Sequence, residues 1–214
     1  MIIKTVFENL PKNLPVFPLD GVLLLPKGRL PLNIFEPRYI QMINDTLSTL
    51  DRMIVITQTK RDQSDSNFFS LGCAGKIVSF EELEDNRFII CLKGIIRCKI
   101  INNISESGGY KRMSVEYSDF AKDLKPNDEK IDRTSFFEKL KPYFKSKNLS
   151  ADWNAIQACD DERLIATLAM ICPFSNIEKQ AILETNTLND RVKVMKKMLA
   201  IGTFEEIQKD DKKH

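Results

Sequence analysis

Prolines interrupt the apolar runs near the start of the chain and limit the secondary structure that this region can form. Between residues 14 and 39 the apolar runs are too short for helices, and they contain Pro15, Pro18, Pro26 and Pro31. Proline lacks the N–H that a sheet ladder needs and drives the preceding residue toward an extended conformation. The segment therefore predicts short strands joined by fixed turns, followed by a helix that begins near Pro37.

The rest of the first half is predicted as a mostly antiparallel sheet. Strand-forming runs are separated by short turns at 84–86, 93–94 and 108–109, and the runs are 52–59, 72–80, 87–92, 95–101 and 110–117. Such spacing is typical of a meander. The polar residues 60–67 predict a loop. One helix, from Pro37 to about Leu50, is expected to bury an apolar face of Ile40, Ile43, Leu47 and Leu50.

The second half is predicted as a helical bundle. The charged residues 119–134 indicate a linker. Each apolar stripe after it is preceded by a residue that can cap a helix, and these residues are Ser135, Ser150, Asp160 or Asp161, Ser175, and Thr187 or Asn189. Pro142 is expected to kink or divide the first of these helices, and Gly202 to end the last. The predicted units are a β-domain at 1–120, a helical domain at 121–204 and a flexible tail at 205–214.

Composition argues against several classes of protein. The net charge of +2 gives no strong preference for an acidic or basic partner. The longest apolar runs are a few residues, against roughly 20 for a membrane span, and Glu8 interrupts any signal-peptide core. We therefore expect a cytoplasmic protein without a membrane partner. The five cysteines, an odd number without a CxxC pair, predict buried thiols and no metal site.

The residues needed for catalysis do not gather in the sequence. His214 is the only histidine and ends the chain, and no GxxxxGK[ST] phosphate loop is present. The carboxylate pairs Glu81–Glu82 and Asp160–Asp161 are adjacent, so their side chains point in different directions. These observations predict a protein that is not an enzyme and that uses no cofactor.

Three segments resemble the N-terminal substrate-recognition domain of the Lon ATP-dependent protease family. Residues 14–39 read LPVFPLDGVLLLPKGRLPLNIFEPRY and are similar to that family's LPxFPL and IFEpRY signatures. Residues 72–100, GCAGKIVSFEELEDNRFIICLKGIIRCKI, resemble its hairpins, with Asn86 where glycine is frequent in the turn. Residues 171–199 look like the helical close of its small stand-alone members.

The resemblance implies an α+β protein, with a PUA-like pseudo-β-barrel followed by an α-helical bundle. In full Lon proteases this region helps to select unfolded or tagged substrates, and the ATPase and protease reactions belong to other domains. The expectation is therefore a non-catalytic member without the ATPase and Ser–Lys protease domains.

Two clusters are candidate binding sites. In the first, Phe35, Glu36, Arg38 and Tyr39 precede or begin the predicted helix, and the Glu36 carboxylate either caps it or pairs with Arg38. This cluster either clamps sheet to helix or contacts a ligand. In the second, Phe68 and Phe69 follow the polar loop and would suit an unfolded peptide, although strand alternation turns one of them inward.

Two further side chains are predicted to be solvated. Arg87 and Arg97 are assigned to adjacent strands and are expected to be surface charges that contribute little.

Two functions remain open from the sequence. The first is a protein-binding module that captures unfolded or specific segments and delivers them to a protease or chaperone, through a surface such as an exposed sheet edge. The alternative is a nucleic-acid-binding PUA-like module, which the dispersed lysines and the lack of a basic stripe disfavour. Neither the identity of the partner nor the oligomeric state follows from the sequence.

Overall fold

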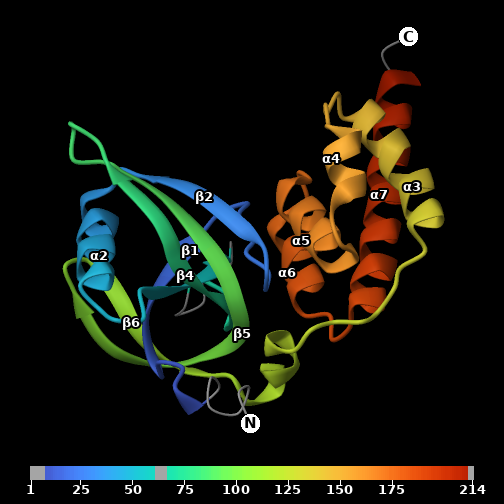
Figure 1. Ribbon diagram of the computed structural model, residues 1–214. Coiled ribbons are helices and arrows are strands. Elements are labelled where there is room, and N and C mark those ends of the chain that lie inside the picture. Colours follow the sequence, from blue (N-terminus) through green and yellow to red (C-terminus); the bar gives the residue numbers. More distant parts are fainter. Residues whose placement is uncertain (1–7, 61–66, 212–214) are drawn as a thin grey trace. The chain divides into compact units, whose positions relative to one another are not determined.

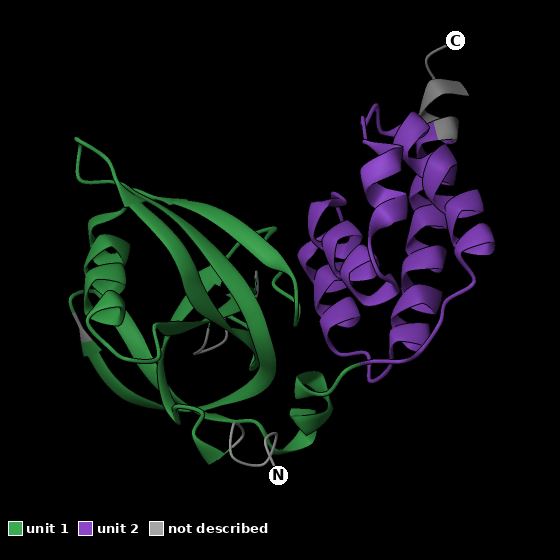
Figure 2. Cartoon of the chain, in the orientation of Figure 1, with its two compact units in different colours: residues 1–126 green, residues 127–214 purple. Residues whose placement is uncertain are grey.

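The computed structural model describes residues 8–60 and 67–211 (Figure 1). It divides the chain into two units, residues 1–126 and 127–214 (Figure 2). The first unit holds a sheet and the second holds helices, so the expected α+β class is confirmed. The division between the units lies inside the charged stretch 119–134.

Six strands form one sheet in the first unit. They are β1 (Asn13–Leu19), β2 (Arg29–Ile34), β3 (Met53–Gln58), β4 (Leu71–Glu82), β5 (Phe88–Ser107) and β6 (Tyr110–Glu116). The order is β2-β5-β4-β3-β1-β6, with an additional pairing of β5 and β6. β1 and β3 are parallel, and the other pairs are antiparallel. Among the described strands β2 pairs only with β5, so it remains an edge of the six-stranded sheet, whereas β6 pairs with both β1 and β5.

Strand β5 is one long element where the sequence predicts two strands and a turn. The predicted turn at Lys93 and Gly94 lies inside β5. Here the chain after β1 crosses the strand: Lys27 N–H donates to the Gly94 carbonyl at 2.9 Å, and Gly94 N–H donates to the Gly28 carbonyl at 2.9 Å. The pairing of β4 with β5 shifts register beside it, between Ala74 and Gly75. The glycine therefore allows a close crossing of two backbones and makes no hairpin.

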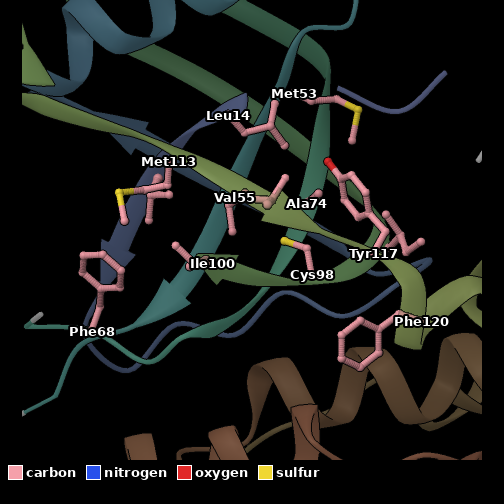
Figure 3. Close-up of a cluster of buried hydrophobic side chains, with 13 residues drawn as sticks. Leu14, Met53, Val55, Phe68, Ala74, Cys98, Ile100, Met113, Tyr117 and Phe120 are labelled. Carbon is pink, nitrogen blue, oxygen red and sulfur yellow. The ribbon is translucent and has the colours of Figure 1, made fainter. Parts of the chain in front are cut away.

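The sheet encloses an apolar core (Figure 3). Its members come from the strands and the segments next to them: Leu14, Val16, Met53, Val55, Phe68, Ala74, Ile96, Cys98, Ile100, Met113, Val115, Tyr117 and Phe120. Burial raises the pKa of the Cys98 thiol to about 12, which keeps it protonated at neutral pH. Cys73, Cys98 and Cys172 are buried as predicted, whereas Cys91 and Cys159 are half-buried.

Helix α2 (Pro37–Leu47) begins where the sequence predicts, with Pro37 in its first turn. The predicted apolar face is partly wrong. The buried residues are Tyr39, Met42, Ile43 and Thr46, and Leu50 lies beyond the helix with 97% of its surface exposed. The helix packs along a line one residue earlier than the sequence periodicity indicates.

The segment predicted as a linker is ordered against the sheet in its first part. Residues Ser118–Leu124 form the short helix η1, and Phe120 is buried in the core. Asp123 accepts hydrogen bonds from the Arg97 guanidinium at 2.9 and 2.8 Å and from Arg97 N–H at 3.0 Å. Arg97 is only 4% exposed, so its prediction as a solvated charge is wrong. The predicted placement on adjacent strands is also wrong, because Arg87 directly precedes β5 and Arg97 lies within it.

Five helices form the second unit: α3 (Arg133–Ser146), α4 (Trp153–Ala158), α5 (Asp161–Ile171), α6 (Asn176–Leu183) and α7 (Leu188–Asp211). Three predicted caps are confirmed: Asp160 for α5, the capping box of Ser175 with Glu178 for α6, and Thr187 for α7, whose hydroxyl accepts from Asp190 N–H at 3.0 Å. The caps predicted at Ser135 and Ser150 are wrong. The N-cap residues are Asp132 for α3 and Asp152 for α4. Their carboxylates accept hydrogen bonds from backbone N–H groups in the first turn of each helix.

Two predicted helix breaks do not occur. Pro142 lies inside α3, which continues past it to Ser146. Gly202 lies inside α7, which continues to Asp211. A Cβ atom at Gly202 would come within 2.6 Å of Tyr143 Cε2, so glycine serves here to admit a buried aromatic ring from α3. Among the described residues, no helix is long and apolar enough to cross a membrane.

Candidate functional site

The predicted pair at the start of α2 forms as an ion pair and not as a helix cap. Glu36 occupies the N-cap position, but its side chain makes no capping hydrogen bond. Arg38 Nε and Nη2 donate to Glu36 Oε2 at 3.0 and 2.8 Å, and this contact raises the pKa of the guanidinium. About half of each side chain is exposed (52% and 44%), so the pair contributes little stability.

Tyr39 links this exposed pair to the core. Its ring centroid lies 4.1 Å from that of Phe17 on β1, and the Arg38 guanidinium lies over the ring at 4.6 Å. Burial raises the pKa of the Tyr39 hydroxyl, which is therefore neutral at physiological pH. Arg38 is thus held over an aromatic ring that packs against β1.

A pocket of about 190 Å³ opens beside Tyr39, and we call it the Tyr39 pocket. Its apolar and aromatic lining comes from four segments that are far apart in sequence: Val16, Pro18, Tyr39, Phe68 and Tyr110. Its other lining residues are Arg38, Asn67, Glu106, Gly109 and Lys111. Three of the six residues predicted as a binding site, Arg38, Tyr39 and Phe68, are therefore brought together here.

The pocket forms where β1 and β6 separate. Their pairing ends at Val16 and Lys111, so β1 continues to Leu19 without β6 beside it. Pro18, which cannot donate to a ladder, lies in this part, which pairs with β3 on its other side. The turn before β6 approaches α2 closely, since a Cβ atom at Gly109 would lie 3.0 Å from Arg38 Cβ, and its φ of +81° also favours glycine.

Tyr110 fixes the other wall of the pocket to α2. Its hydroxyl donates to Asp45 Oδ2 at 2.7 Å, and burial followed by this contact raises its pKa. Arg38 and Lys111 supply positive charge at the rim, and Glu106 supplies one carboxylate. An aromatic floor with mixed charges can hold an apolar side chain while donating hydrogen bonds to the carbonyl groups of the attached backbone.

The remaining predicted residues lie elsewhere. Phe35 is 64% exposed, and Glu36 reaches the pocket only through Arg38. Phe69 is half-buried, with Lys60 Nζ 5.3 Å from its ring centroid. Phe68 is only 7% exposed and belongs to the core (Figure 3), which confirms that alternation turns one of the two rings inward. The predicted loop residues 61–66 lie outside the described part of the chain.

The site has the features of a binding surface. Within the described ranges, no group of three or more His, Cys, Asp or Glu side chains is placed to hold a metal ion. The described lining of the Tyr39 pocket contains hydroxyl, guanidinium, ammonium and carboxylate groups, and neither Cys nor His is among these residues. Sequence reasoning missed Tyr110, Lys111 and Glu106, and the Gly108–Gly109 turn beside them was the one available signal.

A family model matches most of the chain. The model of the ATP-dependent protease La (LON) substrate-binding domain covers residues 13–200. The chain belongs to the LON substrate-binding domain family. The match includes the Tyr39 pocket and the helical unit up to residue 200.

Relatives and solved structures agree with the LON assignment. The chain is 25% identical over 190 residues to a Lon protease of Buchnera aphidicola subsp. Acyrthosiphon pisum, covering 85% of the chain and 24% of that protein. It is 23% identical over 193 residues to Lon protease of Escherichia coli K12, covering 87% and 24%. The chain thus spans about a quarter of the length of these LON relatives.

Two solved structures have a fold similar to that of this chain. A Lon N-terminal domain protein from Xanthomonas campestris aligns with a TM-score of 0.59 at 18% identity, covering 86% of this chain and 97% of that one. The N-terminal domain of a Mycobacterium avium complex Lon protease aligns with a TM-score of 0.60 at 19% identity, covering 90% and 98%. At these identities the alignments establish a LON N-terminal fold. The assignment of the pocket residues depends on the contacts described above.

Proposed function

We propose that this chain is a non-catalytic module that binds protein segments in extended or unfolded form, with the Tyr39 pocket as a contact site. The observation that carries the proposal is the convergence of Tyr39, Phe68 and Tyr110 beside the part of β1 that lies beyond its pairing with β6, in a chain of the LON substrate-binding family. Aromatic anchors supply much of the energy of protein recognition. An adaptor that presents such segments to a protease or chaperone is the role that fits this chemistry.

The charge of the site supports a protein partner over a nucleic acid. Single-stranded nucleic acids are bound by grooves of continuous positive charge lined with stacking aromatics. In the Tyr39 pocket Arg38 is already paired with Glu36, and Glu106 lies opposite Lys111 in the pairing of β5 with β6. A phosphate backbone would meet carboxylates along with cations.

Blocking the pocket is expected to weaken the binding of an unfolded protein about tenfold, the effect of losing one anchor side chain of ordinary strength. The variant is Asn67→Trp, because Asn67 is exposed and lines the pocket, and because its hydrogen bond with Lys60 N–H, at 2.9 Å, is accepted by the backbone carbonyl. Binding is measured by interferometry with a reduced and alkylated test protein.

The matched control is Asn44→Trp, which adds the same side chain at an exposed position of α2 outside the pocket. It should bind as the wild type does. Equal affinity of both variants and the wild type would contradict the pocket assignment. Binding of single-stranded RNA at low salt, abolished by moderate salt, would favour the nucleic-acid alternative instead.

A further inference from the structure

The hairpin of β4 and β5 extends beyond the strand that flanks β4. The pairing of β3 with β4 ends at Met53 and Lys76, after which Ile77 N–H donates to the Arg52 carbonyl at 2.9 Å. β4 continues to Glu82, paired with β5 on its other side. Among the described residues, positions 78–82 therefore have no strand on the side where β3 lay. Figure 1 shows this hairpin projecting at the upper left.

The backbone of this edge directs polar groups outward. Leu83 N–H donates to the Arg87 carbonyl at 2.8 Å, which makes these two residues a hydrogen-bonded pair. In an antiparallel ladder such pairs alternate with pairs whose N–H and C=O groups point away from each other. The register places Phe80 opposite Ile90 and Glu82 opposite Phe88, so Phe80 and Glu82 belong to the second kind. Their N–H and C=O groups thus line the open edge.

The side chains along the edge combine apolar surface with negative charge. Val78 and Phe80 are 44% and 51% exposed, and they lie two residues apart on the same strand. Glu81 and Glu82 are exposed beside them. An extended segment laid along this edge would find apolar contacts together with two carboxylates.

We propose that the open edge at residues 78–82 adds a strand from a partner protein, and that this strand carries apolar side chains alternating with lysine or arginine. The proposal rests on the protein-binding function above and adds a second surface with its own selectivity. Pairing with a second copy is disfavoured, because it would gather four carboxylates, Glu81 and Glu82 of each chain, at one short ribbon.

The test uses the full chain and a labelled short peptide of alternating valine and lysine, with binding followed by fluorescence anisotropy. Phe80→Pro removes an N–H that points outward and leaves the hydrogen bonds between β4 and β5 intact. Edge strands tolerate proline at such positions. We expect about tenfold weaker binding, the equivalent of one or two backbone hydrogen bonds. The double variant Glu81→Gln/Glu82→Gln should weaken binding about threefold or more at low salt.

Glu116→Gln is the matched control, since Glu116 is an exposed carboxylate at the far end of β6, and it should leave binding unchanged. A valine–glutamate peptide should bind more weakly than the valine–lysine peptide. Equal binding of the two peptides, or wild-type affinity in a folded Phe80→Pro protein, overturns the proposal. If Phe80→Pro does not fold, the Glu81→Gln/Glu82→Gln variant provides the test. Wild-type affinity of that variant for the valine–lysine peptide would also overturn the proposal.

The two binding surfaces are separated by Asn67→Trp. This variant should retain the valine–lysine peptide while losing the unfolded test protein. Loss of both ligands would place the peptide in the Tyr39 pocket and overturn the edge assignment. Loss of the unfolded protein alone, with the peptide insensitive to every edge variant, would overturn the edge and leave the protein-binding function standing.

Discussion

Replacing Gly94 with alanine is expected to lower the free energy of unfolding of the sheet unit by about 3–5 kcal/mol. A Cβ atom at this position would overlap the Leu25 carbonyl, with 2.8 Å to the carbonyl carbon and 3.3 Å to Leu24 Cδ1. Overpacking of this kind costs about 1–3 kcal/mol. The two hydrogen bonds of Gly94 with Lys27 and Gly28 would also be displaced, at about 1 kcal/mol each.

Urea unfolding followed by circular dichroism measures this change. The only tryptophan, Trp153, belongs to the helical unit, so its fluorescence reports on the other half of the chain. Gly21→Ala is the control, because a Cβ there would have no atom of the described residues within 4 Å beyond its chain neighbours, while its φ of +69° opposes the substitution. We expect that control to cost about 1 kcal/mol. A Gly94→Ala protein as stable as Gly21→Ala would show that the crossing can separate without loss.

Asp123→Ala is expected to cost about 3–5 kcal/mol, because it leaves the Arg97 guanidinium buried without its carboxylate. Both side chains are almost fully buried, at 4% and 9% exposure, and three hydrogen bonds join the two residues. Arg97 also lies 4.8 Å from the centroid of Phe120, so loss of the pair would release η1 from the core. Thermal and urea unfolding measure the effect.

A second ion pair joins the same two elements and provides the comparison. Lys99 Nζ on β5 contacts Asp119 Oδ2 in η1 at 2.5 Å, but both side chains are about half exposed. Asp119→Ala should therefore leave the unfolding transition nearly unchanged. If Asp119→Ala and Asp123→Ala destabilised equally, burial would not be what makes the Arg97 pair important.

Features set by neighbouring residues were predictable from the sequence. Pro37 begins α2, the Ser175 and Glu178 box begins α6, and Asn86 adopts the positive φ of the hairpin turn at +61°. Each depends on a few residues whose side chains act on their own backbone. The family resemblance, carried mainly by residues 14–39, was confirmed by the family model.

Features set by distant contacts were not predictable. Nothing around Gly94 indicates that residues 25–28 cross over it, so a glycine required by close packing was interpreted as a turn. Arg97 looks like any strand arginine until η1 brings Asp123 against it. The Tyr39 pocket was half predicted: Arg38, Tyr39 and Phe68 were candidates, whereas Tyr110 and Lys111 join them only through the pairing of β1 with β6.

The placement of β1 affects how the sheet unit can assemble during synthesis. β1 lies between β3 and β6, and Lys12 accepts from Val115 N–H at 2.8 Å while the Tyr117 hydroxyl donates to the Pro11 carbonyl at 2.6 Å. Within this unit β1 is therefore synthesised before both of the strands that pair with it, and β6, which covers one of its edges, is the last of the six strands to be made. Folding of this unit should be late and slow, and the nascent chain is exposed to aggregation until residue 117 has emerged.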